Sequence, residues 1–596
     1  MLDMASSCLT LAGICLTQAP INSGDSLFGF PEFLTGLALL ALVFTQSDPL
    51  YRFRIAVAPV PLGGFALAAI LLGGAGSLLT DLWFALGLYS LPWGLPKAAI
   101  QATLGGLVFL TALLWLTFAF AWPPRFSRFN ARKFTMAVYR GLAVGGEGIL
   151  PVIALEIRRS SANIIAACKP ALQSRPSQLA KDLPEEAGYA LDLLRLIADR
   201  RLCRQIVATS PGTAMALIDE AARQKQYSAP LGPFAQNITI EAIKNHDSAL
   251  YHEDRYGTSG LLGQMQPFTR GMYGCYELIE QSGSAAASAL ELHYRDTDGL
   301  TASEWEAYGR ALTVTTADYL RTERPSSGSQ AIKRAIEHLV GSTRTLYQID
   351  GVTEWHQWRD EWAKLHSAMS VINEIVDQID ASPNRPTRRH VLTGQRKYYQ
   401  RDLTDELCDG LLEILFHASA VKGPADTAWS IHHNSFWDGI KQFGNSSETW
   451  SVIRARLIRL LIHELANVRK YADFKSIRIM GLLLNVLGVN EHPKGDTNSE
   501  FAFLRRYVIR LAKTTYIKIV TEQPHVAEAG LLGGITFDAS SKRLVKTYAR
   551  GLRVEPAREY LDLDDWTPPP RGATDDLPAA KRRRRSVRRH SRAADR

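Results

Sequence analysis

The sequence predicts an integral membrane protein in which an N-terminal three-helix transmembrane region precedes a large, mostly all-α cytoplasmic body and a disordered basic tail. Three observations lead to this fold class. Long uncharged apolar runs lie within the first 128 residues, apolar side chains recur with a helical period from about residue 129, and basic residues crowd the last sixteen positions. A chain of 596 residues exceeds what one core holds, so more than one domain is expected.

The transmembrane region, residues 1–128, is expected to contain three spans. Residues 98–122 carry no charge, and a helix of this length crosses a hydrocarbon core of about 30 Å with some tilt. Residues 55–80 are also uncharged, with two prolines near the start, where a helix tolerates them best. Residues 27–46 begin with a stretch that contains Glu32 and continue as apolar and small residues. They are interpreted as the first span, with its polar start at the interface.

The charges of the short loops predict the orientation, because Lys and Arg are enriched on the cytoplasmic side. The loop after the first span carries Arg52 and Arg54, whereas the next loop has Lys97 against Asp81. The segment after the third span holds five basic residues: Arg125, Arg128, Arg132, Lys133 and Arg140. These residues place the N-terminus outside and the C-terminal body in the cytoplasm, as in a multi-pass protein of a bacterial inner membrane.

The second span is rich in small residues, including Gly73, Gly74 and Gly76. Small residues let transmembrane helices approach closely, so packing among the spans of one chain is the favoured interpretation, with oligomer contacts or a pore as alternatives. The second and third spans contain no ionisable residue, which argues against a transport pathway.

The cytoplasmic body shows helical periodicity. Residues 354–379 place Trp355, Trp358, Trp362 and five aliphatic side chains on one stripe, which is typical of a core-facing helix. Residues 183–207 and 449–474 are expected to be two further helices. A hairpin is expected at residues 534–549, where Asp-Ala-Ser-Ser separates two β-prone runs.

Two composition breaks set the predicted domain boundaries. Prolines and a basic polar stretch interrupt the periodicity at residues 380–402, which divides the body into helical domains at 129–380 and 403–565 unless this stretch is a long loop within one domain. Residues 566–596 lack the apolar side chains needed for a core and are expected to be disordered.

The formal charge of +9 is largely a property of the tail. Residues 581–596 hold nine Lys or Arg and one Asp, a net +8, so the rest of the chain is close to neutral. Because the tail is expected in the cytoplasm, an anionic lipid is its favoured partner, with nucleic acid as the less favoured one. The binding residues would be Lys581, Arg582, Arg583, Arg584, Arg585, Arg588 and Arg589. The six scattered cysteines contain no Cys-x-x-Cys and indicate free thiols.

The strongest candidate for chemistry is the segment at residues 245–257, NHDSALYHEDRYG. Its side chains are of the right types for a divalent metal, with His246, Asp247 and His252 as candidates, or for acid/base catalysis, with His252, Glu253 and Asp254 as candidates. If the segment is helical, this spacing does not bring three metal ligands to one face of the helix. A hydrogen-bonded turn that holds helices together is therefore the favoured interpretation.

Other motifs are weaker. His463-Glu464 resembles the start of a zinc-protease helix, but Asn467 stands where the second histidine is needed. His432 and His433 would serve as ligands only in a site completed from elsewhere. No phosphate-binding loop, nucleophile elbow or dinucleotide fingerprint is found, and no cofactor is indicated.

Three functions remain open. The favoured one is a membrane protein whose cytoplasmic helical body is a sensing or interaction platform. On this interpretation a non-enzymatic role is favoured over catalysis, and a homo-oligomer is one alternative for its assembly. The second is a membrane-anchored, metal-dependent hydrolase that uses the 246–254 polar cluster. The third is a pore-forming effector, based only on the glycine-rich second span.

Overall fold

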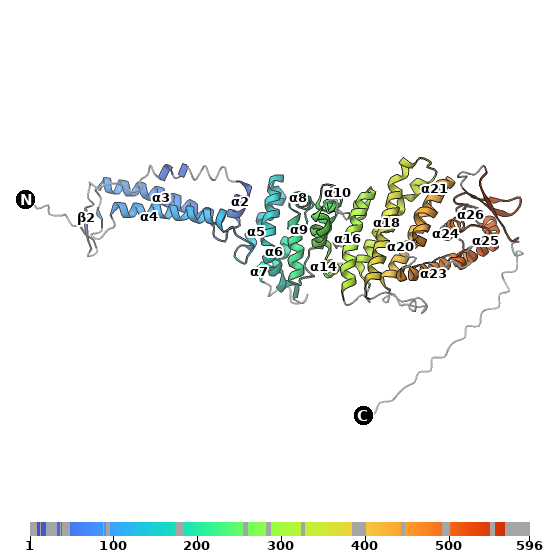
Figure 1. The fold of residues 1–596 in the computed structure, drawn as a ribbon. Coiled ribbons are helices and arrows are strands. Elements are labelled where there is room, and N and C mark those ends of the chain that lie inside the picture. Colours follow the sequence, from blue (N-terminus) through green and yellow to red (C-terminus); the bar gives the residue numbers. More distant parts are fainter. Residues whose placement is uncertain are drawn as a thin grey trace, which may run out of the picture. The chain divides into compact units, whose positions relative to one another are not determined.

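The computed structural model is mostly helical (Figure 1). It describes residues 9–11, 14–18, 33–35, 37–38, 48–87, 89–90, 96–173, 184–253, 260–281, 288–322, 328–383, 401–442, 447–491, 501–548 and 555–566. The predicted first span is described only at 33–35 and 37–38, and residues 567–596 lie outside the described residues. The first of the three predicted spans and the state of the tail therefore stay predictions.

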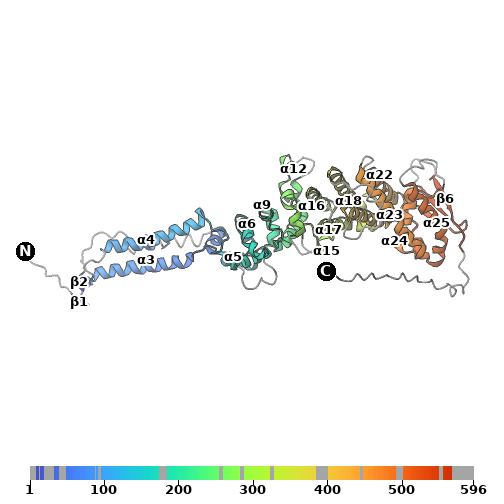
Figure 2. The same cartoon turned by 90° about the horizontal axis from the view of Figure 1, so that it is seen from below.

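Two helices near the N-terminus are long and apolar enough to cross a membrane. They are α3 (Leu62–Ala85) and α4 (Lys97–Leu116), which continues as the π-helix η1 (Thr117–Ala121). The mean hydropathy of their most apolar windows is 1.9 and 2.1. The two helices lie side by side in Figures 1 and 2. Short strands β1 (Leu9–Leu11), β2 (Ile14–Gln18) and β3 (Tyr89–Ser90) form an antiparallel sheet that the sequence reading missed.

Small residues of α3 fit directly against side chains of α4. A Cβ atom added at Gly73 would lie 2.8 Å from Val108 Cγ2, and one at Gly76 would lie 2.9 Å from Leu104 Cδ1. At Gly73 a larger residue would displace the β-branched Val108, whereas at Gly76 the end of the flexible Leu104 side chain would have to move. The glycines therefore have a packing role within one chain.

The base of this helical hairpin is bonded to the body through α2 (Pro49–Ala56). Arg54 Nε lies 2.9 Å from Glu156 Oε1, and Arg54 Nη1 donates to the carbonyl of Ala119 at 3.0 Å. Glu156 is 1% exposed and also pairs with Arg159 at 3.3 Å. The Arg54–Glu156 ion pair thus joins three segments: α2, η1 and the body.

The described chain forms two compact units, each assembled from three segments. The first unit comprises Met1–Arg344, Arg359–Leu411 and Gln442–Ile453, and the second comprises Thr345–Trp358, Leu412–Lys441 and Arg454–Arg596. The predicted break at 380–402, most of which lies outside the described residues, remains a prediction from sequence.

In the first unit, α6 packs against α7 and α9, α8 against α10, and α13 against α9 and α16. Its complete elements after the hairpin are α5 (Ala131–Val144), η2 (Glu147–Ile149), α6 (Leu150–Gln173), α7 (Glu185–Leu196), α8 (Arg200–Thr209), α9 (Pro211–Arg223), α10 (Gly232–Lys244), α11 (Ala249–His252), α12 (Leu261–Met265), α13 (Pro267–Tyr273), α14 (Tyr276–Gln281), α15 (Tyr294–Thr297), α16 (Ala302–Arg321) and α17 (Gln330–Gly341).

Five elements contribute residues to both units: η3 (Ser342–Ile349), α18 (Trp355–Ala381), α20 (Leu403–Ala418), α22 (Asp438–Gln442) and α23 (Glu448–Lys470). Helix α18 confirms the predicted helix at 354–379, and its Leu365, Met369, Ile372 and Val376 are buried. Within the first unit, the start of α23 is fixed to α18. Trp450 Nε1 donates to Asn373 Oδ1 at 3.0 Å, and Thr449 Oγ1 donates to Asp380 Oδ1 at 2.6 Å.

The predicted single helix at 183–207 is wrong, because the structure has α7 and α8 there. The Asp199 side chain accepts hydrogen bonds from the backbone N–H groups of Arg201 and Leu202, at 3.0 and 3.1 Å. Aspartate is a strong N-cap residue, so it starts a new helix where the apolar period alone would continue the old one.

The second unit contains α21 (Ala425–Trp429), the π-helix η5 (Ser430–Trp437), α24 (Phe474–Leu487), α25 (Ala502–Glu522) and α26 (Pro524–Glu528). The predicted hairpin is confirmed as β4 (Ile535–Asp538) paired antiparallel with β5 (Arg543–Thr547). Strand β6 (Arg558–Asp562), which the sequence reading missed, adds to the other edge of β5.

Candidate functional site

Glu253 of the 245–257 segment is a helix-capping residue. It is 3% exposed, and its carboxylate accepts hydrogen bonds from the N–H groups of Phe268 and Thr269, at 2.6 and 2.8 Å, and from Thr269 Oγ1 at 2.8 Å. These donors lie in the first turn of α13, where the backbone N–H groups have no partner within the helix. The carboxylate is therefore fixed as an acceptor in a turn.

The other candidates in this segment point to different surroundings. His246 stacks on Tyr251 with ring centroids 4.8 Å apart, and its Nε2 lies 3.8 Å from Glu304 Oε1. Asp247 and His252 are exposed, and Asp254 lies outside the described residues. Among the residues that the structure describes, no three His, Cys, Asp or Glu side chains are grouped closely enough to hold a metal. The metal and hydrolase hypotheses stay predictions, with Asp254 not placed.

We expect Glu253→Gln to lower the free energy of unfolding by about 1 to 3 kcal/mol, because one carboxylate oxygen becomes an amide donor facing backbone donors. Chemical denaturation of the full chain measures this change. The control is Asp247→Asn, at an exposed position, where we expect a change of about 0.5 kcal/mol or less. Equal stability of both variants would contradict the capping role and return Glu253 to the catalytic candidates.

Two adjoining cavities lie along α16 and α18 in the first unit. The first, of about 310 Å³, lies between the two helices and is lined by Ser303, Trp362, His366 and Ser370 among others. The second, of about 330 Å³, also involves α13 and is lined by Arg270, Asp318, Arg321 and Gln378 among others. Arg310 and Glu374 line both cavities. We call the pair the α16–α18 groove.

Arg310 is the central residue of the α16–α18 groove. Its side chain is 15% exposed, its Nη2 donates to the carbonyl of Leu250 at 3.0 Å, and its Nη1 lies 3.6 Å from Glu306 Oε1. The guanidinium also lies 5.8 Å from the centre of the Tyr251 ring. Leu250 and Tyr251 of the 245–257 segment therefore fix the position of the Arg310 side chain. This gives the segment a positioning role.

Three residues that line the groove carry buried polar atoms with no hydrogen-bond partner among the described residues: Arg310 Nε, Ser367 Oγ and Gln378 Oε1. Buried polar atoms are nearly always paired with protein or ordered water. Each of the three atoms is itself covered by protein, so together they mark incompletely satisfied polar packing around the groove.

The width of the groove is fixed where Gly309 of α16 meets α18. A Cβ atom at this position would lie 2.4 Å from Val371 Cγ2. Because the β-branched valine has little freedom to move away, any larger residue would push the helices apart. Trp362, predicted on the buried stripe of α18, is half-buried and lines the groove instead.

No protein-family model, curated protein or solved structure matches this chain. The groove was not predicted from the sequence because its lining residues are spread from 266 to 378. Most of them lie on amphipathic helices, where their local pattern does not mark a site.

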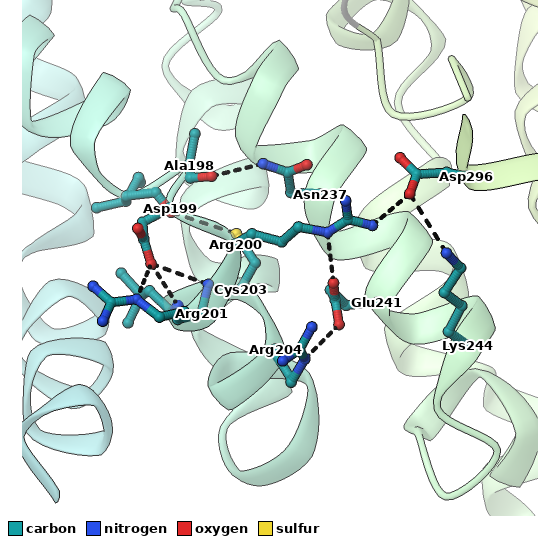
Figure 3. A network of polar contacts seen from close by, with 12 residues as sticks. Ala198, Asp199, Arg200, Arg201, Cys203, Arg204, Asn237, Glu241, Lys244 and Asp296 are labelled. Carbon is teal, nitrogen blue, oxygen red and sulfur yellow. Dashed lines mark hydrogen bonds and ion pairs between the residues drawn. The ribbon is translucent and has the colours of Figure 1, made fainter. Parts of the chain in front are cut away.

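In a charged network near α8, the acidic side chains are paired with basic side chains of the same network (Figure 3). Glu241 accepts hydrogen bonds from Arg200 Nε at 2.8 Å and from Arg204 Nε at 2.9 Å, while Asp296 accepts one from Arg200 Nη2 at 2.6 Å. Lys244 lies 3.4 Å from Asp296. Each carboxylate is paired with two cationic side chains, so the network stabilises the packing of α8, α10 and α15.

The second unit contains a buried polar chain that runs from His432 through Asn485 to Lys546. His432 Nε2 donates to the carbonyl of Ala418 at 3.0 Å, and its Nδ1 accepts from Asn485 Nδ2 at 3.0 Å. Lys546 Nζ donates to the backbone carbonyl of Asn485 and lies 4.0 Å from the ring centre of Tyr548.

Burial lowers the pKa of the residues at both ends of this chain. It lowers the pKa of His432 to about 4, so the imidazole is neutral at pH 7, which fits one donating and one accepting nitrogen. Burial lowers the pKa of Lys546 to about 7, although the nearby Glu559 carboxylate acts in the opposite direction. Both residues are at most 1% exposed, so they stabilise the interior of the second unit and do not face a ligand at its surface.

Proposed function

We propose that this protein is a membrane-anchored interaction platform whose cytoplasmic helical body binds a partner polypeptide in the α16–α18 groove. The observation that carries the proposal is the groove itself, which combines a fixed width at Gly309, a central arginine and a lining of charged side chains of both signs.

The apolar surface of α3 and α4 supports the membrane anchor. Only 33% and 11% of their most apolar windows are buried within the protein. Large side chains are directed outward, such as Leu71 and Leu79 at 61% exposure and Phe109 at 69%. Apolar patches of this size are rare on soluble monomers. In a lipid bilayer these side chains would contact hydrocarbon and would not be exposed to water.

The charges at the two ends of the hairpin support the proposed orientation. Asp81 is bonded to Lys97 and to Gln101 at the loop end, both at 2.9 Å. The opposite end carries Arg52, Arg54 and the basic residues after Ala121. By the positive-inside rule, this second end and the body lie in the cytoplasm, and a further span before α3 places the N-terminus outside. A first span at 27–46 and a lipid-binding tail at 581–589 complete the proposed topology.

The chemistry of the groove supports a partner with both signs of charge. The second cavity offers Arg270, Arg310 and Arg321 against Asp318 and Glu374, whereas the first offers Arg310 against Glu306 and Glu374. Arginine binds carboxylates with two parallel hydrogen bonds, and the neighbouring carboxylates accept from lysine or arginine. A polypeptide segment with alternating charges satisfies both cavities.

Photocrosslinking in the host membrane tests the proposal. A photoreactive amino acid replaces Ser303 or Ser370, which are exposed in the groove, or Glu185 on α7 as an exposed control. We expect a discrete protein adduct in the membrane fraction from the two groove positions, and its loss in the Arg310→Gln variant. An identical adduct from the α7 position, or no effect of Arg310→Gln, would refute binding in the groove. Release of the chain by alkaline carbonate would refute the anchor separately.

A further inference from the structure

A row of arginine and large apolar side chains is exposed along α5 and in the turn that precedes it. We call this surface the α5 face, and it comprises Arg128, Phe129, Arg132, Met136, Tyr139 and Arg140. The exposed fractions of Phe129, Met136 and Tyr139 are 68%, 40% and 51%. Spacings of three and four residues bring positions 132, 136, 139 and 140 to one side of the helix.

The opposite side of α5 is occupied by the body. Phe134, Val138 and Leu142 are buried, and Thr135 Oγ1 donates to the carbonyl of Tyr189 in α7 at 3.2 Å. Helix α5 packs against α7 and α6. The α5 face is therefore the side that the first unit leaves uncovered.

Hydrogen bonds fix the start of α5 next to the ends of both candidate spans. Asn130 Nδ2 donates to the carbonyl of Val57 at 2.9 Å, and Lys133 Nζ donates to the carbonyl of Ala58 at 2.9 Å. These carbonyls precede the first residue of α3 by only a few positions, and η1 ends at Ala121. If the two helices cross a bilayer, α5 begins at the level of its headgroups.

The charge of this region is of one sign. Residues 122–146 contain five basic residues and no Asp or Glu. Lys133 is occupied by backbone carbonyls, but Arg125, Arg128, Arg132 and Arg140 are exposed. The Arg128 guanidinium lies 4.6 Å from the centre of the Phe129 ring, which pairs a cation with an aromatic side chain at the surface.

We propose that the α5 face binds the anionic phospholipid headgroups of the bilayer that α3 and α4 cross. This inference rests on the membrane anchor in the proposed function. The arginines contact lipid phosphates through paired hydrogen bonds, while Phe129, Met136 and Tyr139 enter the interfacial layer beside them. The binding fixes the orientation of the first unit on the membrane, in addition to its anchoring by the spans.

The test measures how deeply α5 lies in the bilayer. A fluorescent amino acid sensitive to polarity replaces Met136 or Tyr139 in the full chain, reconstituted into vesicles of phosphatidylcholine alone or of phosphatidylcholine and phosphatidylglycerol in equal parts. Labels at Leu110 in α4 and at Ser303 in the body report a lipid and a water environment. Quenching by aqueous iodide should be about threefold weaker at 136 and 139 in the anionic vesicles, and the Arg128→Gln, Arg132→Gln, Arg140→Gln variant should lose this difference.

Three results would overturn the inference. Full iodide access at 136 and 139 in both vesicles, with position 110 protected, would refute headgroup binding and leave the anchor intact. Access at position 110 would refute the anchor and the inference together. Protection of positions 136 and 139 from iodide that increases with the protein-to-lipid ratio, and does not depend on the lipid charge, would refute headgroup binding. It would assign the α5 face to contact with a second copy of the chain.

Discussion

Replacing Glu156 by alanine should lower the free energy of unfolding by about 3 to 5 kcal/mol, because Arg54 is left buried without its counter-charge. Arg54 is 11% exposed and lies 2.9 Å from Glu156, so water screens the pair only weakly. Its remaining partner is the carbonyl of Ala119, which does not neutralise the guanidinium. Denaturation of the full chain in detergent micelles measures the loss.

Two further variants identify the source of this effect. Glu185→Ala, at an exposed position on α7, should change stability by about 0.5 kcal/mol or less. The paired replacement Arg54→Met with Glu156→Met should recover most of the loss, because a buried ion pair replaced by apolar side chains is often neutral. A paired variant as unstable as Glu156→Ala would contradict the unpaired charge as the cause.

The second unit should become more stable as the pH rises from about 7, because of Lys546. Burial lowers its pKa from 10.5 to about 7 in the folded chain. Between these values the unfolded chain binds more protons than the folded one, so stability should rise by about 1.4 kcal/mol per pH unit. Below pH 7 the amine is charged in both states, and the full cost of burying the charge remains.

Lys546→Met provides the reference for this measurement, since its side chain has a similar length and no charge. The stability difference between the two proteins, followed by denaturant titration between pH 7 and about 9, cancels the contributions of other titrating groups. At each increase in pH, the free energy of unfolding of the native protein should rise relative to that of the variant. A difference independent of pH would mean that Lys546 keeps an ordinary pKa, with Glu559 and the Trp429 and Tyr548 rings compensating for its burial.

The elements of the fold that depend on local pattern were predictable. The uncharged runs gave α3 and α4, the apolar stripe gave α18, and the β-prone runs gave the β4–β5 hairpin. The break between α7 and α8 was not found, because the capping aspartate at 199 lies inside an uninterrupted apolar period. Strand β6 was missed because it is defined by its pairing with β5 and is not part of the local β4–β5 hairpin.

The candidate site was less predictable, because its residues come together only in the folded chain. The sequence reading identified the polar segment at 245–257 and favoured a structural turn, and the bonds of Glu253 agree with a turn. Nothing local distinguishes Arg310 from other arginines on helix surfaces. Its importance follows from the approach of α16 and α18 at Gly309, which is a property of packing between distant segments.

The interleaved segments of the two units constrain the order of events during synthesis. The first unit is complete only when residues 442–453 have left the ribosome, well after the hairpin of α3 and α4. By then, two of the three segments of the second unit have also emerged. Trp450 and Thr449 complete the contact of the first unit with α18 late in synthesis. The earlier helices of this unit are therefore exposed as an unfinished assembly, at the stage when chaperones recognise exposed apolar surface.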